Sequence, residues 1–385
     1  MRIGVCIQSL TRVLTTATPY RGMLRELLRL RSADEFELYV TQDSINEPLL
    51  VQYLDTLPTS NWRLVPLPYK RRTMALKCLA GLRNYFPINR KVDILLTSDF
   101  DYHHFDNGPQ IANLNDLSAL YAPSEHCSLA WHGRMMRANQ ARLLVRSETF
   151  VTAISQFSQS QLIQFGRRFR ARSEVVHCGI EDCWHADTAG HAESPPIKTP
   201  CWIWWGQITR RKNIDGLLTA YAALLTSLDP RERNGLPAIV LVGAIGRDSE
   251  ALPSQIEQLN LVDRVHILPF QDLSTLVRWV DQSSGVLFPS HFEGFGLPAL
   301  EGLARGKPVM TSDCTSLPEI TGGNAILVTP TNTESIVSGL KTLMHADHSG
   351  LAVRCRREWA SEFTYQSAAK KYSALIAKQL SSDLE

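Results

Sequence analysis

The residues best suited to chemistry lie between positions 288 and 302, where two glutamates enclose a glycine-containing loop. Glu293 precedes Gly294 and Gly296, and Pro298 marks the start of a helix with Glu301 expected in its first turn. Glycines let the backbone approach a ligand closely, and a helix start attracts phosphate. Carboxylates accept hydrogen bonds from hydroxyl groups. The spacing therefore predicts a site for a diphosphate flanked by sugar hydroxyls, as in a nucleotide-sugar; a strand–turn–helix with a capping glutamate is the alternative.

A basic turn could supply the charges that such a diphosphate needs. Arg211 and Lys212 follow the apolar run Cys201–Gly206. When a phosphate group leaves, negative charge develops on it, and Arg and Lys side chains can neutralise that charge without a metal ion. A solvated basic turn is the alternative, and the Glu293–Glu301 segment favours the binding role.

The elements that position these residues are short apolar runs alternating with helix-like segments. Such runs are typical of strands covered on both faces, and their alternation with helices predicts parallel sheets. The strands expected in the first half are Ile3–Ile7, Phe36–Val40, Trp62–Pro66, Ile94–Thr97, Ile111–Asn113, Phe150–Ala153 and Glu174–His177. Those expected in the second half are Cys201–Gly206, Ala238–Gly243, Arg264–Leu268, Gly285–Pro289, Pro308–Ser312 and Ala325–Val328. We therefore expect an α/β chain of two Rossmann-like, doubly wound domains that face a cleft.

A segment rich in proline, around residues 187–200, has the composition of a linker. We expect an acceptor-binding domain over residues 1–187 and a donor-binding domain over residues 188–358. Residues 359–385 are expected to form the last helix, and the pattern is helical over Arg354–Leu380.

Composition excludes several classes of protein. The 385 residues contain 40 Lys and Arg against 38 Asp and Glu, a net charge of +2 that is untypical of a dedicated nucleic-acid binder. The excess of basic residues lies in the first half. No apolar run is long enough to span a membrane, the chain starts like a strand, and its eight cysteines form no Cys-x-x-Cys pair. We expect a cytoplasmic protein with reduced thiols.

The segment Glu293–Glu301, together with Gly306–Val309 and Leu317–Ile320, resembles the signature of retaining glycosyltransferases of family 4, which have the GT-B fold. The resemblance is continuous from about residue 150 to the C-terminus. It includes the segments Ile154–Ser158, Val175–Ile180, Gly206–Asn213 and Phe363–Tyr365, the last of which resembles the aromatic start of the family's final helix. The resemblance implies that this helix packs back on the first domain.

The resemblance implies a role for each part of the donor site. Arg211 and Lys212 would bind the diphosphate, Glu301 the ribose hydroxyls, and Glu293 the donor sugar. The loop residues Gly206, Gly294, Phe295, Gly296 and Leu297 would approach the sugar and phosphate, and Pro269 and Phe270 would lie near the base. Many relatives have Arg where this chain has Gln207, so binding of the diphosphate would depend more on Arg211 and Lys212.

The resemblance also points to a residue of the first domain. Family members often carry a His that faces the donor sugar, and Asn115 stands at that position, followed by Asp116. Asn can hydrogen-bond a sugar but cannot exchange a proton at neutral pH. This favours a mechanism in which the leaving phosphate takes the acceptor's proton. His103 and His104 are candidate substitutes. Asp99-Phe100-Asp101 has the form of a metal motif without supporting context, so we expect neither a metal nor a cofactor.

The segment 69–83 is basic and has leucines at helical spacing. Lys70, Arg71, Arg72 and Lys77 supply its charge. Such a helix can lie on an anionic membrane, which would place the chain at the inner face of the cytoplasmic membrane. An ordinary surface helix that packs its leucines inward is the alternative.

The expected function is transfer of a hexose from a nucleotide-sugar to a glycan or lipid-linked glycan during synthesis of a cell-surface polysaccharide, such as O-antigen or exopolysaccharide. The region Asn115–Ser118 resembles the mannosyltransferase-like branch of the family, so the first expected donor is GDP-mannose and the second is a UDP-sugar. Two alternatives remain: a catalytically weak subunit that binds sugar nucleotides, and a phosphorylase or synthase acting on soluble sugars.

Overall fold

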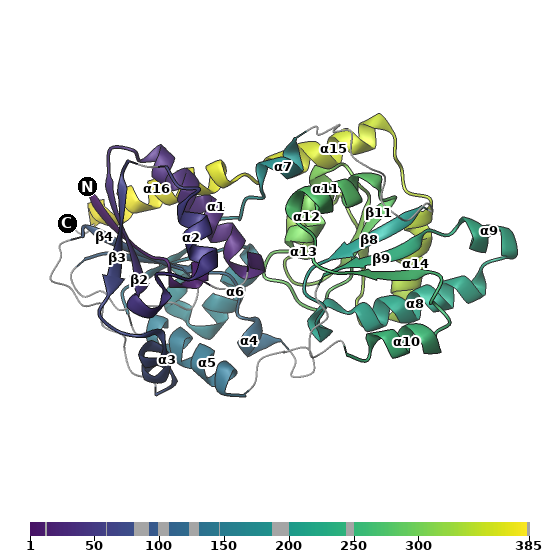
Figure 1. Cartoon of the computed structure of the whole chain (residues 1–385), viewed down its shortest axis with the longest axis horizontal. Helices are drawn as coiled ribbons and strands as arrows, with labels where there is room; N and C mark the ends of the chain where they lie inside the picture. The colour runs from purple at the N-terminus through teal and green to yellow at the C-terminus, as the bar shows by residue number, and fades with distance from the viewer. Residues whose placement is uncertain are drawn as a thin grey trace. The chain divides into compact units, whose positions relative to one another are not determined.

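The chain forms two compact α/β units, each built around one parallel sheet (Figure 1). The computed structural model describes residues 1–11, 14–58, 60–80, 92–98, 108–122, 131–145, 147–186, 200–243 and 250–382. The first unit contains residues 1–121, 129–179 and 363–385, and the second is built mainly from residues 180–362.

The first unit has a seven-stranded sheet in the order β3-β2-β1-β4-β5-β6-β7, and every pairing is parallel. Its strands are β1 (Arg2–Cys6), β2 (Glu35–Thr41), β3 (Trp62–Leu67), β4 (Ile94–Ser98), β5 (Gln110–Leu114), β6 (Phe150–Ala153) and β7 (Ser173–Val175). Its helices include α1 (Leu14–Leu30), α2 (Pro48–Leu54), α3 (Arg71–Leu79), α4 (Ser118–Tyr121), α5 (Trp131–Val145) and α6 (Gln156–Phe165). Every residue of β4 and β5 is buried, as expected for central strands covered by helices on both faces.

The second unit has a six-stranded parallel sheet in the order β10-β9-β8-β11-β12-β13. Its strands are β8 (Cys201–Trp205), β9 (Ala238–Val242), β10 (Val265–Leu268), β11 (Gly285–Phe288), β12 (Val309–Ser312) and β13 (Ile326–Val328). Its helices are α7 (Asp182–His185), α8 (Ile214–Ser227), α9 (Pro230–Gly235), α10 (Leu252–Gln258), α11 (Leu273–Gln282), α12 (Leu297–Ala304), α13 (Leu317–Thr321), α14 (Thr333–Met344) and α15 (Gly350–Ser361).

The C-terminal segment forms two helices rather than one. Helix α15 ends at Ser361, and α16 (Tyr365–Ser382) begins after Thr364, whose hydroxyl accepts a hydrogen bond from the N–H of Ser367 at 3.1 Å. Helix α16 packs against α1 in the first unit, and its apolar face joins that unit's core (Figure 1). The expected helical run Arg354–Leu380 therefore contains a break, because Thr364 starts a new helix.

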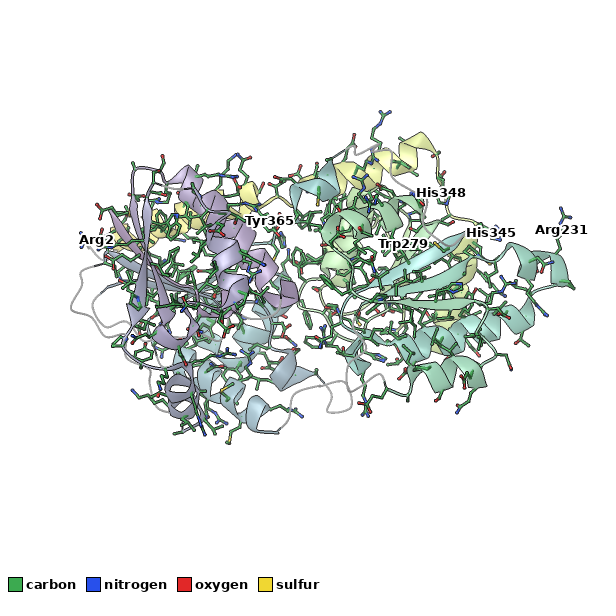
Figure 2. All side chains as sticks on the ribbon, viewed as in Figure 1. Arg2, Arg231, Trp279, His345, His348 and Tyr365 are labelled. Carbon is green, nitrogen blue, oxygen red and sulfur yellow. The ribbon has the colours of Figure 1, made fainter. Side chains whose placement is uncertain are left out.

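Tyr365 fixes the contact between α16 and α1 (Figure 2). Its ring lies against Gly22, where a Cβ atom would come within 2.2 Å of the ring. The guanidinium of Arg25 lies over the same ring, 5.9 Å from its centre. A small residue on α1 is thus required for the last helix to pack there.

The expected fold class is confirmed: the chain has two parallel-sheet α/β units and a helical C-terminus. Each of the thirteen expected strands is present within one or two residues of its predicted bounds. Over the part of the chain that the structure describes, helices are too short or too polar to cross a bilayer.

Candidate active site

The predicted donor residues gather where the strand order of the second sheet reverses. Strands β8 and β11 are neighbours at its centre, although they are far apart in sequence. Ligands of doubly wound sheets bind at the carboxyl ends of strands at such a point. The loop after β8 carries Arg211 and Lys212, and the loop after β11 carries Glu293. The topology therefore brings Arg211 and Lys212 next to Glu293, although the two groups belong to loops that are distant in sequence.

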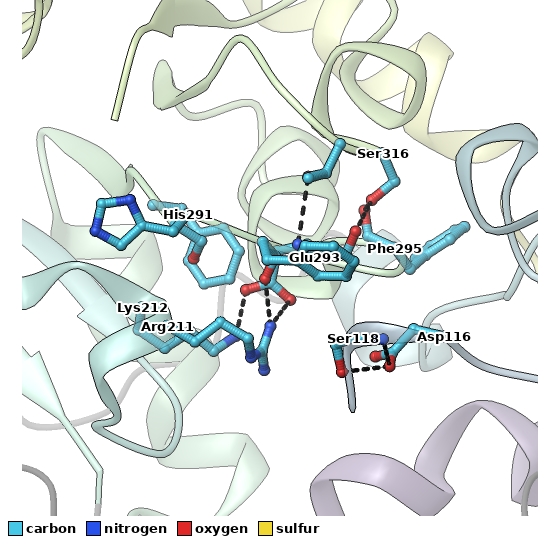
Figure 3. Close-up of polar contacts among 12 residues, drawn as sticks. Asp116, Ser118, Arg211, Lys212, His291, Glu293, Phe295 and Ser316 are labelled. Atoms are coloured by element: carbon cyan, nitrogen blue, oxygen red, sulfur yellow. Dashed lines mark hydrogen bonds and ion pairs between the residues drawn. The ribbon is translucent and has the colours of Figure 1, made fainter. Parts of the chain in front are cut away.

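Glu293 is held between the two cations (Figure 3). Its Oε1 lies 2.7 Å from Lys212 Nζ, and its Oε2 lies 2.8 Å from Arg211 Nη1. The side chain is only 8% exposed. Burial alone would raise the pKa of Glu293, but Arg211 and Lys212 outweigh it and lower that pKa to about 2. Two cations and one carboxylate leave a net charge of +1, which suits a phosphate group.

Neighbouring side chains hold both loops in place. Asn213 adopts a left-handed backbone conformation with φ of 57°, and its amide donates to the carbonyls of Pro289 and Pro330 at 3.0 and 2.8 Å. The Ser316 hydroxyl contacts the carbonyls of Glu293 and Phe295 at 3.0 and 2.7 Å (Figure 3). Because these contacts come from separate elements, the trio of charges lies on a fixed frame.

Helix α12 begins at the glycine that the sequence analysis singled out. Gly296 is its N-cap with φ of 108°, and a Cβ atom there would lie 2.5 Å from the side chain of Leu317. Pro298 stands in the first turn, so the helix start next to Gly294, Phe295 and Leu297 has the expected form.

Glu301 lies in the second turn of α12, not in the first, because the helix begins at Leu297. Its Oε2 accepts a hydrogen bond of 2.9 Å from the indole N–H of Trp205, the last residue of β8. Burial raises the pKa of Glu301 to about 7 against the opposing effect of that hydrogen bond, and the charge of Glu181 adds to the rise. A carboxyl group that titrates near neutrality is thus present in the predicted ribose site.

Trp205 was missed by the sequence analysis. Its ring stacks on Trp184 of α7, with centres 5.8 Å apart and planes 15° from parallel. The indole N–H donates the hydrogen bond that the carboxylate of Glu301 accepts. One feature of the sequence could have indicated its role. Trp205 ends an apolar strand, and the N–H of a buried tryptophan usually has a hydrogen-bond partner.

The remaining donor-side candidates lie just after β8 and β10 of the second sheet. Gly206 comes directly after β8 with φ of 137°. Pro269 and Phe270 follow β10, and Phe270 is 65% exposed. An exposed aromatic ring at the end of a strand can stack on a base, and the base is expected near these two residues.

Asn115 and Asp116 lie in the first unit, directly after β5. The Oδ1 of Asn115 accepts a hydrogen bond of 3.0 Å from Asn113, and its carbonyl accepts one of 3.2 Å from Ser158. Asp116 accepts from the N–H and the hydroxyl of Ser118, so it caps α4 (Figure 3). His103, His104 and the Asp99–Asp101 segment lie outside the described residues.

Comparisons with known proteins find similarity to glycosyltransferases. Residues 192–359 match the family described as "Glycosyl transferases group 1". The chain is 25% identical to the O-antigen chain mannosyltransferase B of Escherichia coli over 333 residues, which cover 82% of each protein.

Solved structures with similar folds cover nearly the whole chain. Sucrose-phosphate synthase from Thermosynechococcus elongatus superposes with a TM-score of 0.74 at 16% identity, over 99% of this chain and 100% of that one. HepE from Anabaena, solved in complex with UDP-glucose, superposes with a TM-score of 0.66 at 18% identity, over 99% and 100% of the two chains. The fold is that of GT-B glycosyltransferases, and the family match supports a glycosyltransferase.

Proposed function

We propose that this glycosyltransferase retains the configuration of the sugar it transfers and moves a hexose from a nucleotide-sugar to a glycan or lipid-linked glycan. The proposal rests on one observation above the others. Glu293 is buried between Arg211 and Lys212 at the point where the strand order of the second sheet reverses. A diphosphate needs the cations, and a sugar hydroxyl can donate to the carboxylate.

The reaction would use these groups without a protein base. The bond between the anomeric carbon and the β-phosphate oxygen breaks, while the acceptor oxygen forms a bond to the same carbon from the same face. The acceptor's proton passes to a phosphate oxygen. Arg211 and Lys212 would neutralise the charge that develops on the leaving diphosphate, so this proposal requires no metal ion or cofactor.

For the donor we propose GDP-mannose first. The supporting observation is the similarity to an O-antigen chain mannosyltransferase over most of both chains. Synthesis of a cell-surface polysaccharide, such as O-antigen in lipopolysaccharide or an exopolysaccharide, is the process that this similarity suggests. A UDP-sugar is the second candidate, because a protein of similar fold was solved with UDP-glucose.

A panel of nucleoside diphosphates tests the donor class directly. A ligand that binds only the folded state stabilises it, by about 2.7 kcal/mol at a hundred times its Kd. If GDP-mannose is the donor, GDP is therefore expected to raise the melting temperature more than UDP. Transfer of labelled mannose to a glycan acceptor tests the activity. Greater stabilisation by UDP would reassign the donor, and binding without transfer or hydrolysis would favour a sugar-nucleotide-binding subunit.

We propose that the acceptor side of the protein lies against an anionic membrane. Helix α3 packs against α5 (Figure 1), and Lys70, Arg72 and Lys77 are exposed beside Leu76, which is 59% exposed. Leu76 does not pack inward, which favours the membrane interpretation of this helix over the ordinary one. A lipid-linked acceptor would then be reached from the cytoplasmic face of the membrane.

A further inference from the structure

The first unit contains a buried polar network that joins its last helix to two strands of its sheet. The Tyr372 hydroxyl of α16 donates to Asn113 Oδ1 of β5 at 3.0 Å. The Thr152 hydroxyl of β6 lies 2.5 Å from the Tyr372 hydroxyl and 3.3 Å from Asn113 Oδ1. Asn113 and Thr152 lie 259 and 220 positions before Tyr372 in the sequence, so only the packing of α16 on the sheet brings the three residues together.

The network continues to the residue that stands in place of the family's histidine. Asn113 Nδ2 donates to Asn115 Oδ1 at 3.0 Å. The Asn113 amide can make this bond while its oxygen accepts from the hydroxyls, because the oxygen and the nitrogen of an amide point in different directions. Tyr372 and Thr152 thereby set the direction in which Asn113 presents its donor, and Asn113 sets the orientation of Asn115.

Burial makes this orientation costly to disturb. Tyr372 is 3% exposed, Asn113 is 7% exposed, and Thr152 has no exposed surface. A buried polar group that loses its partner costs about 1–3 kcal/mol, so the members of the network restrict one another. Burial also raises the pKa of Tyr372 far above its usual value, so its hydroxyl remains a neutral donor at every physiological pH.

The network also borders a hollow in the first unit. Asn113 and Tyr372 line a small open pocket together with His177 and Cys178. A polar network with a role only in core packing would not need to reach a pocket. It would also not need to end on a side chain at the carboxyl end of a strand. Its position matches that of groups that orient an active-site residue.

We propose that Tyr372 is a positioning residue that fixes the amide of Asn115 for sugar transfer through Asn113. The proposal rests on the function proposed above and on the resemblance, which implies that Asn115 takes the place of a His that faces the donor sugar. It gives the last helix a part in the reaction beyond its packing on α1. Tyr372 itself touches no substrate in this proposal, and its effect passes entirely through Asn115.

The test is a double-mutant cycle on transfer activity. Tyr372→Phe removes one hydroxyl and keeps the ring in the core, and we expect kcat to fall about tenfold with the donor KM nearly unchanged. In the background of Asn115→Ala, the same replacement is expected to have no further effect, because coupled residues are not additive. A hydroxyl that only stabilised the fold would lower both backgrounds alike.

Two further variants distinguish the proposed effect on kcat from a loss of folded protein. Thr152→Val removes the neighbouring hydroxyl and is expected to lower kcat in the same direction. Tyr53→Phe is the matched control, since Tyr53 is a buried tyrosine of the same unit whose hydroxyl donates to the Arg21 carbonyl at 3.0 Å; its kcat should stay unchanged.

The outcomes separate the two proposals. Wild-type kcat in Tyr372→Phe, or the same fold-loss with and without Asn115, would overturn the positioning role while leaving the proposed function standing. A wild-type protein that transfers no sugar would refute the proposed function instead. Melting temperatures of all variants, measured alongside, show which of them are folded.

Discussion

At Glu293 two cations share one carboxylate, and each partner has a different expected role. Replacing Lys212 with Ala removes a cation that would stabilise the leaving diphosphate. We expect turnover to fall about 10²–10³-fold, the usual loss when one group that stabilises developing charge is removed. Steady-state transfer assays at saturating donor measure this, with circular dichroism to check the fold. Near-wild-type turnover in the folded variant would contradict the assignment of Lys212.

Glu293→Gln is the counterpart of that variant. It removes the negative charge, so the site carries a net charge of +2 instead of +1. Affinity for a nucleoside diphosphate is therefore expected to rise while turnover falls, because the sugar loses its carboxylate acceptor. Calorimetric titration measures the affinity. Weaker binding by this variant would mean that Arg211 and Lys212 do not contact the diphosphate.

In the proposed ribose-binding role, Glu301 would give nucleotide binding a dependence on pH. Burial raises its pKa to about 7, with Glu181 and Cys183 nearby and Lys212 opposing the rise. If Glu301 binds the ribose as proposed, the ribose hydroxyls would donate to its carboxylate form, so binding would favour deprotonation and become tighter as the pH rises through 7. For a single group with this pKa, we expect affinity to be about tenfold higher at pH 8 than at pH 6.

Titrations at several pH values check this prediction. Glu301→Gln is the control, because it keeps the ionisation of the nucleotide's own phosphate and removes that of the side chain. In the wild type, the hydrogen bond from Trp205 lowers the pKa of Glu301. Trp205→Phe removes this bond, so the midpoint of the pH dependence should move above 7. Equal pH profiles for wild type and Glu301→Gln would refute the role of this carboxylate.

At the scale of elements, the packing of α16 on α1 depends on one small residue. A Cβ atom on Gly22 would lie 2.2 Å from the Tyr365 ring, a contact that no side chain could tolerate without a shift. We expect Gly22→Ala to lower the free energy of unfolding of the first unit by about 1–3 kcal/mol, the usual cost of overpacking. Chemical denaturation followed by hydrogen exchange in α1 and α16 measures the loss.

The second unit offers a matched control for that replacement. Gly235 ends α9, and a Cβ atom there would have no neighbour within 4 Å. Gly235→Ala is expected to leave stability nearly unchanged. If both variants lost the same stability, the cause would be a general effect of removing glycine and not the contact between α1 and α16.

At the scale of the whole molecule, the surplus of basic residues in the first half predicts where a membrane would bind. We expect the protein to float with vesicles that contain anionic lipid and to remain unbound with neutral vesicles. Replacing Lys70, Arg72 and Lys77 with Ala should abolish flotation without changing nucleotide binding. High salt should weaken the binding as well, because the attraction is electrostatic.

The replacement of exposed arginines elsewhere on the first unit controls for net charge. Arg167, Arg168 and Arg170 follow α6 and are exposed, so their replacement with Ala removes the same number of charges away from α3. This variant is expected to float like the wild type. Equal loss in both triple variants would show that overall charge, and not the α3 surface, attracts the membrane.

The sequence alone determined the strands and the loops that matter. Apolar runs such as Ala238–Val242 become buried strands because local hydrophobicity decides which segments leave water. The string from Glu293 to Glu301 likewise predicted a loop and helix start, since glycine and proline act through their own backbone preferences. The start of α16 was indicated only by the resemblance of Phe363–Tyr365 to the start of the family's final helix. The helical pattern over Arg354–Leu380 shows no break there, because a single threonine, Thr364, starts the new helix.

The tertiary structure decided which side chains meet. Lys212 and Glu293 are 81 residues apart, and Trp205 and Glu301 are 96 apart; strand order at the centre of one sheet brings both pairs together. Tyr372 reaches Asn113 only because α16 packs beside β5 and β6 in the first unit. Partners of this kind cannot be read from local sequence, because a hydrogen bond between distant residues depends on how whole elements pack.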